Sequence, residues 1–174
     1  MLLAILSIIA LLVIGWYFVS HKLMADAGER VMLAWAALDR AQRQREDLAR
    51  QILANHRDST QITHELDRAW QEAMEVNANP DEADAHSLRQ YAKKQAALAE
   101  ALEAWLQQLP EPRSEAETNG LSEQYPLIKR QIAEAIRYYN QEVDHHNRRK
   151  QQFPINMLSF PEKAAYPNQA QSYN

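Results

Sequence analysis

The chain has 174 residues, of which 46% are hydrophobic and only 3 are glycine, and its formal net charge is −4 at pH 7. It contains no cysteine, which excludes disulfides, thiolate nucleophiles and cysteine-bound metals. Acidic and basic residues are interspersed and form no broad basic face, which argues against nucleic acid as a partner. Strong helix formers dominate and no window has the alternation of a strand, so we expect an all-α protein.

An uncharged apolar segment occupies the N-terminus from Leu2 to Val19. As a helix it would be about 27 Å long, close to the ~30 Å hydrocarbon core of a bilayer. Trp16 and Tyr17 stand at the end where interfacial aromatic residues are common. We therefore expect residues 1–20 to be a transmembrane anchor that contacts lipid through residues 2–19. The alternative is a cleaved signal peptide, because the segment 25–27 has the small-residue spacing of a cleavage site.

Apolar residues recur at helical spacing in four later segments, which predicts four amphipathic helices. The first helix is expected to continue from the span, with Gly28 as a possible hinge. The last is expected to begin at Ser122, with Pro126 in its first turn and residues 110–121 as an exposed loop before it. We expect residues 21–160 to form an antiparallel bundle and residues 161–174 to be a flexible polar tail.

The end of the fourth helix is expected beside the membrane, because short connections make successive helices antiparallel. Three basic and two aromatic residues would then lie near lipid headgroups: Arg148, Arg149, Lys150, Phe153 and Phe160. The basic residues also suit the negative end of a helix, and the aromatic residues could instead cover the base of the bundle. These interpretations are compatible with one another.

Arg45 interrupts the apolar row of the first bundle helix. It either extends to water from the edge of the row or is buried and paired, so that it fixes the register of the helices. Antiparallel alignment puts Glu134 of the last helix at a similar height. We expect Arg45, Asp47 and Glu134 to be the register residues.

Polar residues on the last helix are candidates for contact with a partner: Tyr138, Asn140 and Asn147. Tyr139 lies in the apolar row and is expected in the core. Of the six histidines, His145 and His146 are adjacent and would point about 100° apart on a helix, which does not suit chelation. We expect no metal ion, cofactor or catalytic residue.

Two stretches carry a recognisable pattern: one runs from Arg30 to Asp39 and continues to Leu48, and the other runs from Arg137 to Val143, then through Asn147 to the segment 153–158. Together with the N-terminal apolar segment, they resemble the LemA family of bacterial membrane proteins. The resemblance implies one N-terminal transmembrane helix, four long helices and no established enzymatic activity. A Pro-Asn pair that is usual in the first helix of this family is absent after Asp47, so no kink is expected there.

These features favour a non-enzymatic scaffold or adaptor at a bacterial inner membrane, presenting its bundle to protein partners or to copies of itself. The basic residues Lys22 and Arg30 follow the single span and none precedes it, which favours a cytoplasmic C-terminal domain. The alternative function is lipid binding or membrane remodelling through residues 148–160. An enzyme with an unrecognised site is a third hypothesis.

Overall fold

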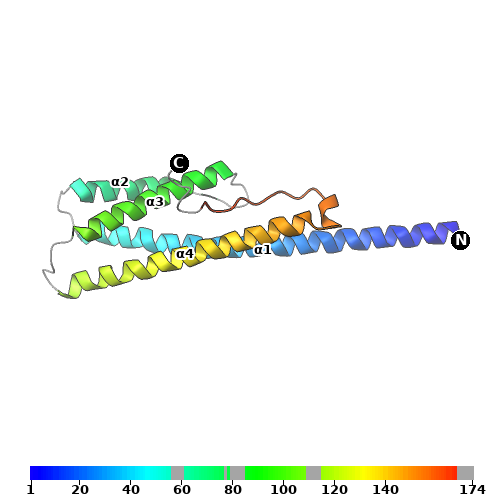
Figure 1. Cartoon of the computed structure of the whole chain (residues 1–174), viewed down its shortest axis with the longest axis horizontal. Coiled ribbons are helices and arrows are strands. Elements are labelled where there is room, and N and C mark those ends of the chain that lie inside the picture. Colours follow the sequence, from blue (N-terminus) through cyan, green and yellow to red (C-terminus); the bar gives the residue numbers. More distant parts are fainter. Residues whose placement is uncertain (56–60, 77, 79–84, 109–114, 168–174) are drawn as a thin grey trace.

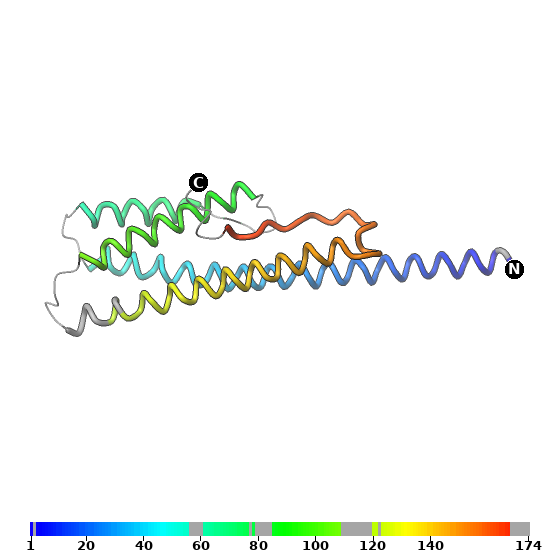
Figure 2. The backbone as a smooth tube through the Cα atoms, in the orientation of Figure 1, coloured from blue at the N-terminus to red at the C-terminus, as the bar shows by residue number. Residues whose placement is uncertain are grey.

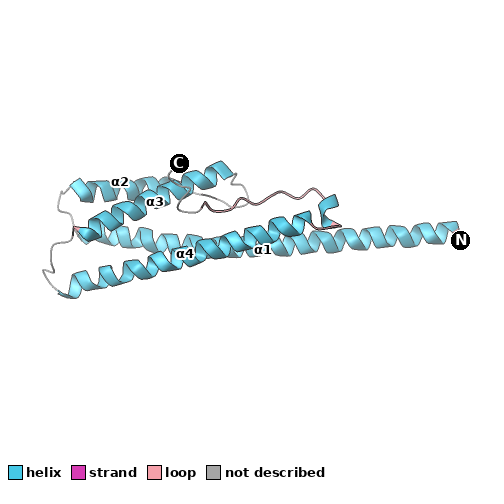
Figure 3. Cartoon of the chain, in the orientation of Figure 1, coloured by secondary structure: helices cyan, strands magenta, loops and turns pink. Residues whose placement is uncertain are grey.

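The computed structural model describes residues 1–55, 61–76, 78, 85–108 and 115–167. It confirms the expected fold class, because these residues form helices and contain no strand (Figure 3). The elements are α1 (Leu2–Asn55), α2 (Gln61–Glu75), α3 (Ala85–Gln107), α4 (Glu115–Gln151) and the short 3₁₀-helix η1 (Ile155–Met157).

Helix α1 runs without a break for 54 residues, so the apolar segment and the first bundle helix are one helix. Its N-terminal part projects beyond the other elements (Figure 1), and its apolar side chains are exposed, with Leu3 at 81% and Leu12 at 67%. Within the described residues, α1 is the one helix long and apolar enough to cross a membrane. It passes through Gly28 and Asp47 without interruption, so neither marks a hinge.

Helices α2 and α3 pack on each other and on the part of α1 that lies far from the N-terminus (Figure 2). Helix α4 returns along α1 in the opposite direction, as expected for short connections (Figure 1). The residues between α1 and α2 (56–60) and most of those between α2 and α3 (77 and 79–84) lie outside the described part of the chain.

Helix α4 begins earlier than the sequence predicts. It starts at Glu115, so Ser122 is not its cap and Pro126 lies inside it rather than in its first turn. The expected exposed loop at 110–121 is therefore helical from Glu115 onward. Glu and Ala are strong helix formers and are frequent before Ser122, which outweighs the single breaker Gly120.

The core consists of two clusters along the bundle. The cluster nearer the N-terminus includes Trp35, whose ring lies 5.4 Å from that of Tyr139 and 5.7 Å from that of Tyr91. The other includes Leu48, Leu66, Leu98, Leu102 and Trp105. A fully buried Leu side chain contributes roughly 1.5–3 kcal/mol, whereas an exposed ion pair contributes about 0–1 kcal/mol. The clusters therefore hold the bundle together more than the exposed pairs on its helices do.

The segment 161–167 is not a flexible tail. After η1 the chain turns back along the bundle (Figure 2), and the side chain of Tyr166 is only 5% exposed. Polar composition predicted a loose segment, but its backbone and the Tyr166 hydroxyl find partners on α1 and α4. Residues 168–174 lie outside the described part of the chain.

Candidate functional site

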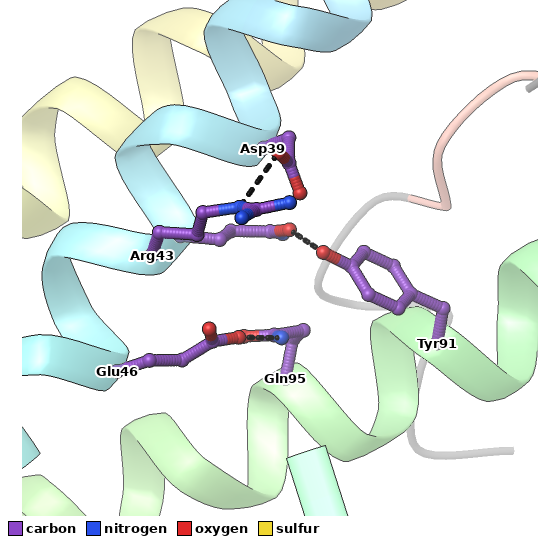
Figure 4. Close-up of polar contacts among 6 residues, drawn as sticks. Asp39, Arg43, Glu46, Tyr91 and Gln95 are labelled. Atoms are coloured by element: carbon purple, nitrogen blue, oxygen red, sulfur yellow. Dashed lines mark hydrogen bonds and ion pairs between the residues drawn. The ribbon is translucent and has the colours of Figure 1, made fainter. Parts of the chain in front are cut away.

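A layer of polar side chains crosses the middle of the bundle between α1 and α3 (Figure 4). Gln42 of α1 is 1% exposed and accepts a hydrogen bond of 2.5 Å from the Tyr91 hydroxyl of α3. The Gln42 amide in turn donates to the Tyr166 hydroxyl over 2.9 Å. One buried glutamine thus joins α1, α3 and the C-terminal segment.

Arg45 lies one turn further along α1 and is also buried, at 5% exposed. Its Nη2 donates to Gln95 Oε1 over 2.5 Å, and Gln95 Nε2 donates to Glu46 Oε1 over 2.7 Å. The Arg45 Nε atom has no hydrogen-bond partner among the described residues. Arg45 is therefore inside the bundle and does not extend to water from its edge.

The register pair predicted from the sequence is not the one that forms. Glu134 is exposed and pairs with Arg130 on its own helix at 2.9 Å, while Asp47 is exposed at the surface of α1. The partner of Arg45 is Gln95 of α3 instead. The predicted height was also wrong, because Trp35 lies against Tyr139 and Arg45 lies beside Lys129 and Ile132 rather than Glu134.

Burial shifts the pKa values of this layer. It lowers the pKa of the Arg45 guanidinium and raises the pKa of the Glu46 carboxyl, where the hydrogen bond from Gln95 acts in the opposite direction. Burial also raises the pKa of Tyr166 to about 12. The tyrosine hydroxyls therefore remain protonated at neutral pH and serve as hydrogen-bond donors and acceptors.

An open pocket of about 390 Å³ lies beside the polar layer, between α1, α2 and α3. Arg43 and Asp39 line this pocket and form an ion pair of 2.9 Å, which Figure 4 shows near Tyr91. Its lining carries both signs of charge, from Asp39, Arg43, Glu46, Asp47 and Arg50. Within the described residues no three His, Asp or Glu side chains gather as a metal ion would require.

Asn140 and Asn147 hold the C-terminal segment against α4. The Asn140 side chain donates to the Tyr166 carbonyl over 2.9 Å and accepts from the Tyr166 N–H over 2.7 Å. Asn147 bonds the carbonyl and N–H of Lys163 in the same way, at 2.9 and 3.0 Å. These two residues, which were candidates for a partner, thus bind their own chain.

The spacing explains this arrangement. Seven residues of a helix rise about 10.5 Å from Asn140 to Asn147, and three residues of extended chain span about 10 Å from Lys163 to Tyr166. The two repeats match, so both asparagines reach the backbone of one straight segment. Tyr139 adds a hydrogen bond from its hydroxyl to the Ala164 carbonyl at 3.0 Å. Tyr138 points elsewhere and stays 43% exposed.

The predicted membrane-surface residues gather where α4 ends beside α1. Arg149 Nη1 donates to the Leu23 carbonyl of α1 over 3.4 Å, and Arg148 and Lys150 pair with Asp144 and Glu162. Phe153 is 81% exposed, whereas Phe160 is half-buried with its ring 6.0 Å from that of His21. The C-terminal end of α4 thus lies next to the end of the apolar segment.

Sequence reasoning missed Gln42 and Tyr166 as structural residues. The available signal was Gln95, a polar residue in the middle of an apolar helical row, which indicates a buried partner. Nothing local to Tyr166 could identify its place, because its partner Gln42 is 124 residues away.

The chain matches the model of the LemA family over residues 34–172 and therefore belongs to this family. No curated protein shows significant sequence similarity to it. The match begins at Ala34 within α1 and includes α2, α3, α4, η1 and the returning C-terminal segment. The resemblance noted in the sequence is thus confirmed.

Proposed function

We propose that this member of the LemA family is a non-enzymatic membrane-anchored scaffold. Residues 2–19 would hold it in a bacterial inner membrane by a single span, with the bundle on the cytoplasmic side. The bundle would present its outer faces to protein partners or to copies of itself. The observation that supports this most directly is the continuity of α1 from exposed apolar segment to buried bundle helix.

A continuous helix suits a scaffold because no loop separates the anchor from the bundle. The part of α1 beyond Ser20 is about 50 Å long, so the far end of the bundle would stand well away from the bilayer. Several buried polar side chains of the bundle bond to one another, as in the chain from Tyr91 through Gln42 to Tyr166, although Arg45 Nε has no partner among the described residues. These hydrogen bonds hold the helices and the C-terminal segment together, and this structural role of the buried polar groups favours a non-enzymatic function.

Large apolar side chains also remain on the outside of the bundle. Leu33 and Leu127 are each 61% exposed, and Tyr138 is 43% exposed. Exposed aromatic and apolar side chains are typical centres of protein interfaces. We therefore expect partner contact at some of these positions.

Photo-crosslinking in native membranes tests the proposal. A benzophenone amino acid would replace Leu33, Leu127 or Tyr138 in the full-length protein, with the exposed polar residue Gln141 as the matched control position. We expect a discrete crosslinked product at one apolar position, identified by mass spectrometry. The yield of crosslinked product from Gln141 should be lower. A protein that gives no discrete product at any of the three positions and is monomeric in native membranes would overturn the scaffold role.

The absence of cysteine makes the membrane side easy to test. Ala133→Cys, on the exposed face of α4, would carry the single thiol of the protein. A cytoplasmic bundle predicts no labelling of intact cells by a membrane-impermeant maleimide, and labelling after lysis. Labelling of intact cells would place the bundle on the other side.

Contact with the membrane surface is a second candidate function, favoured by the exposure of Phe153 at 81% and Met157 at 70% near the end of α4. An environment-sensitive fluorophore on Phe153→Cys should report an apolar surrounding in nanodiscs. The same fluorophore on Gln107→Cys, at the distal end of α3, should report water. Equal signals from the two sites would contradict this function.

A further inference from the structure

A groove of about 300 Å³ lies between α1 and α4 at the end of the bundle nearest the apolar segment. Its lining includes three arginines, namely Arg30 of α1 and Arg148 and Arg149 of α4, against one acidic residue, Glu142. Arg148 is engaged by Asp144 at 2.9 Å. Among the described residues, neither Arg30 nor Arg149 forms a salt bridge. The groove therefore carries uncompensated positive charge.

The height of the groove follows from the hydrogen bond between Arg149 and the Leu23 carbonyl. Leu23 lies about 6 Å beyond the end of the apolar run at Val19. The polar layer of a bilayer is about 5–8 Å thick on each side of its hydrocarbon core. If residues 2–19 span that core, Arg149 lies at the level of the lipid phosphates.

The other end of the groove extends away from the membrane. Arg30 stands about 16 Å beyond Val19 along the same helix. The groove thus runs from the phosphate layer into water, along the direction that a lipid headgroup takes. Phe153, exposed at 81% just after α4, lies on the membrane side of it.

We propose that this groove binds the headgroup of an anionic phospholipid. The phosphate would meet Arg149, the outer part of the headgroup would extend toward Arg30, and the acyl chains would lie along the exposed apolar face of α1. Arginine suits this role because its planar guanidinium donates two parallel hydrogen bonds to phosphate oxygens. The proposal rests on the membrane span proposed above.

Native mass spectrometry of the full-length protein in detergent micelles, titrated with phosphatidylglycerol or phosphatidylcholine of identical acyl chains, tests this site. We expect tighter binding of phosphatidylglycerol, and roughly fivefold weaker binding after Arg149→Gln or Arg30→Gln, the factor for one basic residue near an anionic surface. Arg137→Gln is the matched control, because Arg137 is an exposed residue of α4 outside the groove. It should leave the affinity unchanged.

Three results would overturn the assignment: equal affinity for the two lipids, an equal effect of Arg137→Gln and Arg149→Gln, or displacement of the lipid by millimolar inorganic phosphate. The last would indicate a site for free phosphate. Extraction of the membranes with carbonate tests the proposed span separately from the proposed lipid groove, and it would be applied to the wild-type protein and to each variant. Wild-type protein released by carbonate would refute the span itself, whereas inserted variants with wild-type lipid affinity would refute only the groove.

Discussion

The pairing of Asn140 and Asn147 with the returning segment predicts a local effect of each substitution. Each asparagine makes two hydrogen bonds to one backbone residue. A protein hydrogen bond contributes about 1 kcal/mol net, so Asn140→Ala or Asn147→Ala should cost about 2 kcal/mol. For a protein of this size, that loss lowers Tm by about 4–8 °C.

Hydrogen exchange measured by NMR gives the sharper assay, because the protected amides are known. The Tyr166 N–H donates to Asn140 and the Lys163 N–H donates to Asn147. A loss of about 2 kcal/mol corresponds to roughly thirtyfold faster exchange. We expect Asn140→Ala to accelerate exchange at Tyr166 first, and Asn147→Ala to accelerate it at Lys163 first, in full-length protein in nanodiscs.

Two further variants make the test specific. Asn140→Asp keeps an acceptor for the Tyr166 N–H but loses the donor to its carbonyl, so an intermediate effect is expected. Tyr138→Phe alters the neighbouring exposed side chain and should change neither amide. Unchanged exchange in both alanine variants, or equal acceleration by Tyr138→Phe, would refute the reasoning.

Three further predictions concern the buried groups. Tyr166→Phe leaves the buried Gln42 amide without its acceptor and should lower the free energy of unfolding by about 1–3 kcal/mol in a denaturant titration, whereas Tyr138→Phe should change it by less than about 0.5 kcal/mol. Burial raises the pKa of Glu46, so the stability linked to this group is present below about pH 4.5 and is lost as the pH rises through the folded-state pKa. Glu46→Gln should therefore raise Tm at pH 7 more than at pH 4, and an equal change at both would contradict this. Burial lowers the pKa of His146, so the stability linked to it is present above about pH 6.5 and is lost as the pH falls through the folded-state pKa. His146→Gln should flatten the dependence of Tm on pH between 7 and 5, and an unchanged slope would count against it.

Patterns that repeat along one helix were readable from the sequence. The apolar run ending at Val19 predicted the apolar N-terminal part of α1, and apolar residues recurring every three or four positions predicted the bundle part of α1 and α3. The closeness of Arg149 to the start of the bundle followed from topology alone. These inferences needed only local spacing and the direction of successive helices.

Features that depend on distant partners were not readable. Arg45 could be identified as unusual in its row, but its partner Gln95 depends on how α3 is rotated. The place of Tyr166 depends on Asn140 and Gln42, which lie far from it in sequence. The start of α4 was misplaced for a local reason: Ser122 is a good capping residue, but the helix formers Glu115, Ala116 and Glu117 before it let the helix begin earlier.

The unbroken course of α1 also has a mechanical consequence. A helix without a hinge transmits a rotation at one end as a displacement at the other, so a tilt of the proposed membrane span would move the far end of the bundle. Transmembrane helices tilt by about 0–40°, depending on bilayer thickness and on their neighbours. With an arm of about 50 Å, a change of about 10° in tilt would carry the distal end of the bundle sideways by about 9 Å. The lateral position of that end would then follow the thickness of the surrounding membrane.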